Sequence, residues 1–294
     1  MASPANTCEL DIVETESVTV ETESVEAEAV AVETVTVELV ESVTVETVAV
    51  EAVAVESAEI KSNDYPVTCV SCFFEITNKH GNNFFNWFNN SLKINCPYVI
   101  FGNKSSLEKI KRYRNGLPTH YIEMEITDFE TYKYYNTIQP HPIHCPSKEL
   151  NLIWNEKLFF IEKTKDLNIF HSEYFIWVDA GICTYRNKKP PSQPFPSLDR
   201  LSILAKDKFN FTSSDWPTYK YKPGYYHFIS GTYALHKDFI KGFIKTYREA
   251  CDKYLQIDDW IYTDQVILTL IYQDDKSLFK QIGHGYGAIL PLLY

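Results

Sequence analysis

Charge divides this 294-residue chain into two unlike parts, because no Lys or Arg occurs before Lys61. Residues 1–60 hold 15 of the 39 acidic residues, and the first aromatic residue is Tyr65. Residues 61–294 therefore hold 24 acidic and 28 basic residues, a formal charge of +4 in a chain whose total is −11. A segment with charge of one sign and no aromatic side chain cannot bury a core. We predict a low-complexity Glu/Val/Thr repeat tail over residues 1–62 and one folded domain over residues 63–294.

The predicted tail repeats a motif close to Glu-x-Val-x-Val, for example at residues 28–32, 33–37 and 51–55. The repeat advances by five residues, an odd number, so successive valine pairs would point to opposite faces of an extended strand. This excludes one continuous half-buried strand. A small β-solenoid with corners every five residues remains an alternative. The one-sign charge favours disorder, in which case the tail acts as a spacer or as a tether to a partner.

Cysteine spacing and hydropathy limit the class of protein. The seven cysteines are odd in number and irregularly spaced, which argues against a disulfide framework. Cys69 and Cys72 have the spacing of a zinc or redox pair, but they lie in a strand-like run, where residues three apart point to opposite faces. The sequence shows no signal peptide and no run of about 20 apolar residues that would span a bilayer. We expect a soluble, cytoplasmic protein.

Strand-like and helix-like segments alternate through the predicted domain. Runs typical of strands occupy residues 67–76, 97–102, 119–126, 174–178 and 226–235, and patterns typical of helices occupy residues 84–92, 105–114, 147–161, 239–255 and 259–272. This alternation predicts the α/β class, with a parallel, Rossmann-like sheet.

Three charged residues occupy positions that suggest chemistry. Asp179 follows the all-apolar run 174–178, and ligands of open α/β sheets bind beyond the carboxyl ends of the strands. It is a candidate metal, ribose or sugar ligand, or else the cap of the following turn. Asp264 lies on the inward stripe of a helix, where an acid needs a function or a core hydrogen bond. Lys157 lies in or beside the apolar stripe of the 147–161 helix, so it either extends to solvent or meets a negative partner.

Glycines mark two further candidate positions. Gly231 interrupts the strand-like run 226–235, and glycine within a strand often marks the close approach of a ligand or another backbone. Residues 282–287 read Ile-Gly-His-Gly-Tyr-Gly, in which the glycines would let the backbone approach a phosphate. His284 in this run is a candidate metal ligand, although a glycine-rich turn with an incidental histidine is common.

Most of these residues fall in blocks that resemble the HtrL/YibB-like (WlaTC) family of glycosyltransferases. The blocks read Thr-Cys-Val-Ser-Cys-Phe-Phe-Glu at 68–75, Glu-Leu-Asn-Leu-Ile-Trp-Asn-Glu-Lys at 149–157, Phe-Ile-Trp-Val-Asp-Ala-Gly-Ile at 175–182, and Ile-Ser-Gly-Thr-Tyr at 229–233 with Thr-Asp-Gln-Val-Ile-Leu at 263–268. They occur in the order of the family, and the resemblance covers residues 66–294. It implies a GT-A-like, Rossmann-type mixed sheet flanked by helices. It also implies an enzyme of glycan or glycoconjugate synthesis that moves a sugar from a nucleotide-sugar donor to a hydroxyl of a glycan acceptor.

On the donor side, the resemblance implies roles by position. Phe74 and Glu75 would lie near the base or ribose, and Asp179 would begin the acidic motif. Lys157 would face Asp179 or the diphosphate, and His284 would be a late ligand of a metal ion or of the diphosphate.

On the acceptor side, the resemblance places Ser230, Gly231 and Thr232. Asp264 would act as the catalytic acid or base, beside Asp179 as the other catalytic residue. A base is needed if the acceptor hydroxyl attacks from the opposite face of the sugar.

One residue departs from the family pattern of GT-A enzymes. The usual Asp-x-Asp has Gly181 in its second acidic place, and that second carboxylate normally binds the divalent ion. If an ion is used, Asp179 and His284 would supply ligands to Mg²⁺ or Mn²⁺ together with the phosphates of the donor. Otherwise Lys157 with His284 would stabilise the charge on the leaving diphosphate.

Two other readings compete with the enzyme. A degenerate transferase could keep the pocket as a non-catalytic nucleotide- or carbohydrate-binding module, or the acidic tail could be the functional part beside an inert domain. Nucleic-acid binding is not expected, because no dense basic patch is present; the basic residues at 109–114 are typical of a solvated helix face.

Overall fold

A computed structural model describes residues 64–77, 80–81, 83–140, 145–214, 228–256, 261 and 263–294. The tail predicted over residues 1–62 lies outside the described residues. Its disorder and its role as a tether therefore stay predictions, and the same holds for the small β-solenoid.

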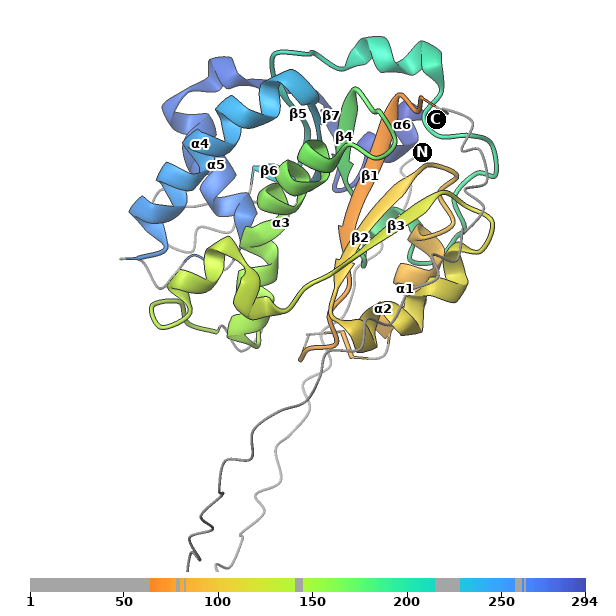
Figure 1. Cartoon of the computed structure of the whole chain (residues 1–294). Coiled ribbons are helices and arrows are strands. Elements are labelled where there is room, and N and C mark those ends of the chain that lie inside the picture. Colours follow the sequence, from red (N-terminus) through yellow and green to blue (C-terminus); the bar gives the residue numbers. More distant parts are fainter. Residues whose placement is uncertain are drawn as a thin grey trace, which may run out of the picture. The chain divides into compact units, whose positions relative to one another are not determined.

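The described strands form one seven-stranded sheet in the order β3-β2-β1-β4-β6-β5-β7 (Figure 1). They are β1 (Val67–Cys72), β2 (Tyr98–Gly102), β3 (Thr119–Glu123), β4 (Tyr174–Trp177), β5 (Phe209–Ser213), β6 (Ile229–His236) and β7 (Phe279–His284). β1 to β4 are parallel, β6 is antiparallel to β4 and to β5, and β7 is parallel to β5. The predicted α/β class, with a Rossmann-type mixed sheet flanked by helices, is confirmed.

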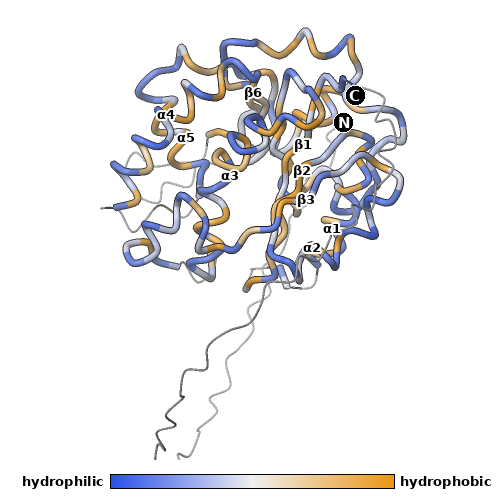
Figure 2. The backbone as a smooth tube through the Cα atoms, viewed as in Figure 1, coloured by the Kyte–Doolittle hydropathy of each residue, from blue (hydrophilic) through white to orange (hydrophobic). Residues whose placement is uncertain are grey.

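Helices cover both faces of this sheet (Figure 1). One face carries α3 (Lys148–Leu167), α4 (Lys237–Tyr254) and α5 (Asp264–Asp274), and the other carries α1 (Asn83–Ser91), α2 (Lys104–Ile110) and α6 (Ile289–Leu293). Short 3-10 segments lie at Lys111–Arg114, Ile126–Asp128, Glu130–Tyr134, Cys183–Tyr185, Leu198–Ile203 and Lys276–Leu278. Figure 2 shows that hydrophobic and hydrophilic residues alternate along the helices, as expected for elements with one face against the sheet. None of the helices in the described ranges combines the length and apolarity needed to cross a bilayer.

The directions of the strands decide which residues meet at one edge. β6 runs opposite to its neighbours, so it begins at the edge where the other six strands end. This edge therefore gathers the residues that follow β1, β4 and β7 together with the first residues of β6. It is also the edge at which open α/β sheets bind their ligands.

The first strand is shorter than predicted. β1 ends at Cys72 rather than at residue 76, because its neighbour β2 ends at Gly102 and leaves residues 74–76 without a strand partner. The N–H of Glu75 instead donates to the hydroxyl of Ser106 at 3.0 Å. The segment after β1 is thereby held away from the sheet. Cys69 and Cys72 lie in the cores on opposite faces of the sheet, as their spacing predicted, so they do not form a zinc or redox pair.

The second half of the sheet differs more from the prediction. No element is predicted at β5, which has only five residues. The last residues of β7, 282–284, belong to the run that is predicted to be a glycine-rich turn. The predicted helix over 259–272 begins later, at Asp264, and residues 257–260 and 262 lie outside the described residues. The helix predicted over 105–114 is α2 followed by a 3-10 turn.

Candidate active site

Asp179 projects from the end of the central strand β4, which is buried at every position. The N–H of Val178 donates to the carbonyl of Val70 on β1 at 2.9 Å, and the chain leaves the sheet at the next residue. The side chain of Asp179 keeps 18% of its surface exposed. Its carboxylate binds other side chains rather than capping the following turn, so the functional interpretation of this position is the one that the geometry favours.

Lys157 approaches the same edge from α3. The helix is fixed at its start by Ser147, whose hydroxyl accepts the N–H of Leu150 at 3.2 Å, as predicted. Lys157 Nζ lies 2.9 Å from Asp179 Oδ1 and 3.2 Å from Asp264 Oδ1, with only 3% of the lysine side chain exposed. The lysine therefore meets two negative partners and does not extend to solvent.

Asp264 is the first residue of α5 and is fully buried. The hydroxyl of Thr263 donates to its Oδ1 at 2.9 Å, and the hydroxyl of Tyr233 on β6 donates to its Oδ2 at 3.4 Å. With Lys157, these contacts engage both carboxylate oxygens. The role of Asp264 as the base for an acceptor hydroxyl stays a prediction. In this structure the carboxylate has no exposed surface on which it could meet that hydroxyl.

Tyr286 completes the cluster from the loop after β7, and sequence analysis missed it. Its hydroxyl donates to Asp179 Oδ2 at 2.9 Å, while the indole N–H of Trp177 donates to Asp179 Oδ1 at 2.7 Å. The loop turns at Gly285 and Gly287, which have φ values of +107° and +76°, a backbone region open mainly to glycine. The available signal was the Gly-Tyr-Gly sequence, but nothing in it pointed to the tyrosine rather than to the neighbouring histidine.

Gly231 makes room for this arrangement. A Cβ added to it would lie 2.3 Å from the Tyr286 hydroxyl and 2.7 Å from Asp179 Oδ2, closer than real Cβ atoms come. The prediction was that a ligand or another backbone approaches this glycine, whereas the structure places side-chain atoms of Tyr286 and Asp179 there. The approaching atoms belong to the protein itself.

Burial and charge act against each other in the cluster. Burial alone would lower the pKa of Lys157, but Asp179 and Asp264 outweigh it and raise the pKa above its usual 10.5. Burial raises the pKa of Asp264, with Lys157 opposing the change and Asp179 adding to it. Burial and Asp179 raise the pKa of Tyr286 well above 10, so the tyrosine keeps its proton and acts as a donor. With both carboxylates ionised, the lysine and the two acids carry a net charge of −1.

The other predicted acceptor-side residues do not share the position of Gly231. Neighbouring residues of a strand point to opposite faces, so Ser230 and Thr232 face away from the side on which Gly231 meets Asp179. The hydroxyl of Ser230 lies 3.0 Å from that of Thr212 on β5, and both Ser230 and Thr232 are fully buried. In this structure neither side chain is presented to an acceptor.

His284 also lies apart from the charged cluster. Its Nδ1 is 2.8 Å from the Ser213 hydroxyl and 3.2 Å from the Gln281 amide nitrogen, and its side chain is exposed. The partners of Asp179 are Lys157, Trp177 and Tyr286. Asp179 and His284, the two predicted metal ligands, therefore contact different side chains.

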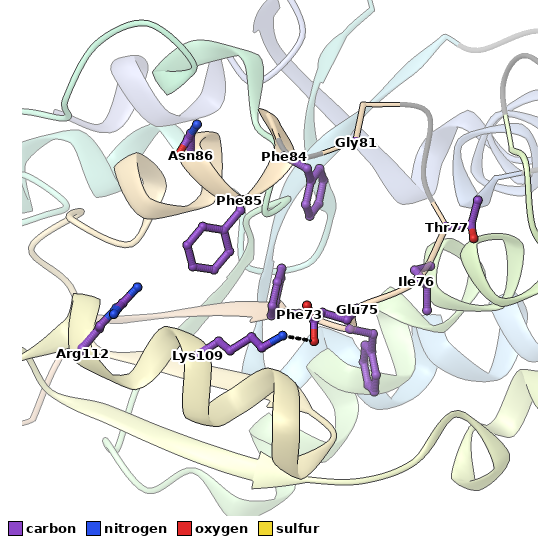
Figure 3. A pocket seen from close by; sticks show the side chains of 11 residues that line it. Phe73, Glu75, Ile76, Thr77, Gly81, Phe84, Phe85, Asn86, Lys109 and Arg112 are labelled. Carbon is purple, nitrogen blue, oxygen red and sulfur yellow. Dashed lines mark hydrogen bonds and ion pairs between the residues drawn. The ribbon is translucent and has the colours of Figure 1, made fainter.

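A hollow of about 930 Å³ opens at the end of β1 (Figure 3). Its walls are the segment after β1, with Phe74 and Glu75, the α1 rings Phe84 and Phe85, and the basic side chains of the α2 region. Glu75 forms an ion pair with Lys109, drawn as a dashed line in Figure 3.

Phe84 connects this hollow to the loop that follows Asp179. A Cβ added to Gly181 would lie 2.8 Å from Cε2 of Phe84, so the ring of the hollow packs directly on that glycine. The predicted donor-side residues Phe74 and Glu75 therefore line a cavity whose wall contacts the loop that begins at Asp179.

The residues present do not fit a divalent-ion site. Both oxygens of Asp179 accept hydrogen bonds from side chains of the protein, as do both oxygens of Asp264, and an ammonium group lies between the two acids. Within the ranges that the structure describes, no group of three His, Cys, Asp or Glu side chains is placed to hold a metal ion. The Asp179 and His284 pair in particular is not assembled as a ligand set.

The fold and the site define an α/β protein with a charged cluster and an adjoining hollow at the carboxyl edge of its sheet. The chain belongs to the HtrL/YibB family: residues 138–288 match its model, described as a bacterial protein of unknown function. The chain is 21% identical over 233 residues to Protein HtrL of Escherichia coli (strain K12), a match that spans 71% of this chain and 80% of the relative.

Solved structures give more distant similarities. The 4-diphosphocytidyl-2C-methyl-D-erythritol synthase of Anaerococcus prevotii DSM 20548 matches with a TM-score of 0.36 and 13% identity, over 76% of this chain and 90% of that one. The apo-form glycosyltransferase GlyE of Streptococcus pneumoniae TIGR4 matches with a TM-score of 0.38 and 9% identity, over 73% of this chain and 44% of that one.

Proposed function

We propose that this protein is a glycosyltransferase that moves a sugar from a nucleotide-sugar donor to a hydroxyl acceptor. The observation that carries the proposal is the hollow at the end of β1, whose Phe84 ring packs on Gly181, two residues after Asp179. Its volume of about 930 Å³ lies within the range of small-molecule sites, roughly 300 to 1,000 Å³.

The walls of the hollow suit a nucleotide. Phe73, Phe84 and Phe85 offer aromatic rings to a base, and Lys109 and Arg112 offer positive charge to phosphate oxygens. In Figure 3 the phenylalanine rings of α1 and the basic side chains border one opening. A molecule with a flat base at one end and phosphate groups further along matches this combination of surfaces.

Asp179 is the group best placed to meet the sugar. Its carboxylate is held by three different donors, and it is the most exposed of the three charged side chains. A carboxylate fixed in this way accepts hydrogen bonds from hydroxyl groups without reorganising. Arg186 lies on the same loop, where its Nε donates to the Gly181 carbonyl at 3.0 Å and its guanidinium stacks on Trp87 at 4.2 Å. It supplies a positive charge for the leaving diphosphate.

Binding of the donor is tested by titrating the full chain with a panel of nucleotide sugars in a calorimeter. The substitution Phe84→Ala removes one ring from the hollow, and stacking of a base on an aromatic side chain contributes about 1–3 kcal/mol. We expect about 5- to 150-fold weaker binding. Phe239→Ala on α4 removes the same ring at a partly buried position outside the hollow, and should leave the affinity unchanged. Equal affinities for all three proteins would reject the hollow as the donor site.

Turnover is tested by measuring release of the nucleoside diphosphate. Asp179→Asn should abolish transfer while circular dichroism shows an unchanged fold; turnover at the rate of the unsubstituted protein would remove Asp179 from the mechanism.

A second candidate function is a non-catalytic binding module, which the complete burial of Asp264 favours. It predicts that the unsubstituted chain binds a nucleotide sugar but never releases its diphosphate, with any acceptor supplied. The two assays together therefore separate the two functions.

A further inference from the structure

The charged cluster already contains a cation between its two acids. Lys157 Nζ is within 3.2 Å of one oxygen of Asp179 and one of Asp264, and the lysine is almost completely buried. A divalent ion that bridged these carboxylates would need the space that the ammonium fills. It would also have to displace donors that bind the remaining oxygens, among them Tyr286 at 2.9 Å.

The loop after Asp179 cannot supply a second acid for an ion. At Gly181, a Cβ would lie 2.8 Å and 3.1 Å from two carbon atoms of the Phe84 ring, and 3.6 Å from the Trp87 ring. Any side chain at this position therefore requires the Phe84 ring to shift. Glycine in the second acidic place of Asp-x-Asp therefore fits the close packing between this loop and α1.

We propose that Lys157 stands in place of the divalent ion, so that the protein binds and uses its donor without a metal. The side chains that carry the positive charge are then Lys157, which keeps Asp179 and Asp264 together, and Lys109 and Arg112, which line the hollow. The part of this inference that concerns the donor rests on the proposed function. The part that concerns the ammonium and the metal does not.

The first test uses Mn²⁺ alone as the probe, followed by electron paramagnetic resonance. The measurement compares variants that all contain the 15 acidic residues of positions 1–60, so that any ions held by that segment are common to all of them. We expect unsubstituted protein and Asp179→Asn to bind the same number of ions with the same affinity. One additional ion in the unsubstituted protein, lost in Asp179→Asn, would overturn the proposal.

Removing the lysine should create the site that it now occupies. In Lys157→Ala two carboxylates face one another with no cation between them, and we expect one tighter Mn²⁺ ion that raises the melting temperature and is removed by EDTA. The double variant Lys157→Ala with Asp179→Asn should lose it. A folded Lys157→Ala protein that gains no ion would overturn the claim that the ammonium occupies a metal position. If circular dichroism shows this variant unfolded, the comparison with Asp179→Asn decides alone.

The second test uses UDP and GDP as probes, each titrated in EDTA and in Mn²⁺. We expect dissociation constants that agree within about twofold between the two conditions. An affinity at least tenfold higher in Mn²⁺, with the gain lost in Asp179→Asn, would overturn the inference. Failure of both nucleotides to bind would count against the proposed function, whereas the experiment with Mn²⁺ alone would still decide the role of Lys157.

Discussion

Gly231 offers a direct test of the packing that holds the charged cluster. Alanine at this position would place its Cβ 2.3 Å from the Tyr286 hydroxyl and 2.7 Å from Asp179 Oδ2, so both groups must move. Overpacking of a buried site costs about 1–3 kcal/mol. Loss of the hydrogen bond from Tyr286 to the charged carboxylate costs about 1.5–3 kcal/mol. Because the same movement causes both losses, we expect Gly231→Ala to lower the free energy of unfolding by about 2–4 kcal/mol.

Urea denaturation measures this change, and the chain supplies a matched control. Gly242 lies exposed within α4, and an added Cβ there meets no atom within 4 Å. Gly242→Ala should therefore stabilise the protein by about 0.5–1 kcal/mol, the usual gain of alanine over glycine in a helix. The same chemical substitution is thus expected to have opposite signs at the two positions.

A double-mutant cycle locates the cause of the loss. Tyr286→Phe removes the hydroxyl that lies closest to the new methyl group, after which the nearest ring atom is Cζ at 3.1 Å. Gly231→Ala should therefore cost less in the Tyr286→Phe background than in the unsubstituted protein, by about 1 kcal/mol or more. Strictly additive losses, or a Gly231→Ala protein as stable as the unsubstituted one, would refute the reasoning.

Two further predictions concern buried charges outside the cluster. Burial raises the pKa of Glu156 from 4.5 to about 7, against the opposing effect of hydrogen bonds from Thr131, so the folded state retains a proton that the unfolded state releases between these values. The associated stability is complete below about pH 4.5 and is lost as the pH rises through 7. Between pH 5 and pH 8 the unsubstituted protein should lose up to about 3 kcal/mol more than Glu156→Gln in urea titrations, and parallel pH profiles would contradict this. Arg114 is buried and donates to the carbonyls of Leu92, Ile94, Cys96 and Pro118, a fork that a lysine cannot reproduce. Arg114→Lys should cost about 3–5 kcal/mol, whereas Arg200→Lys at an exposed position should stay within about 0.5 kcal/mol; equal effects would show that the fork is dispensable.

The first half of the sheet could be predicted because its strands are short runs rich in β-branched, aromatic and apolar residues that alternate with helical patterns. Such a pattern needs no knowledge of distant partners. The end of β1 could not be predicted in this way, since three of the four residues at 73–76 are as apolar as those of the strand itself. The strand stops where β2 stops pairing with it. β5 has five residues, and it is a strand only because β6 and β7 lie on either side of it.

The charged cluster could be predicted in part. A lysine and an aspartate on inward helix faces, and an aspartate at the end of a buried strand, are each unusual, and the structure brings these three together. The glycine-rich run was the point at which the sequence misled. β7 shifts its register against β5 between Phe211 and Thr212, and His284 pairs with Ser213 at the end of the strand. The turn at Gly285 then delivers Tyr286 to Asp179. The register shift decides which residue of the glycine-rich run 282–287 reaches Asp179, and the spacing of residues within the run does not reveal that shift.

The partners of a buried charged residue indicate whether its role is structural or functional. Arg114 and Glu156 are surrounded by backbone groups, and each ties neighbouring loops to one another or to a helix, so their environments account for them as structural residues. The cluster around Lys157 is different, because its charges are held mainly by side chains from separate elements: α3, α5, the end of β4 and the loop after β7. Well-packed apolar residues are often as stabilising as a buried ion pair, or more so. A stable core would not need this arrangement. The carboxylate that it orients, Asp179, is the one of the three charged side chains that remains partly exposed, and it lies at the carboxyl edge of the sheet. Burying these charges costs free energy, and the arrangement is explained by its effect, which is to hold the carboxylate of Asp179 in one position.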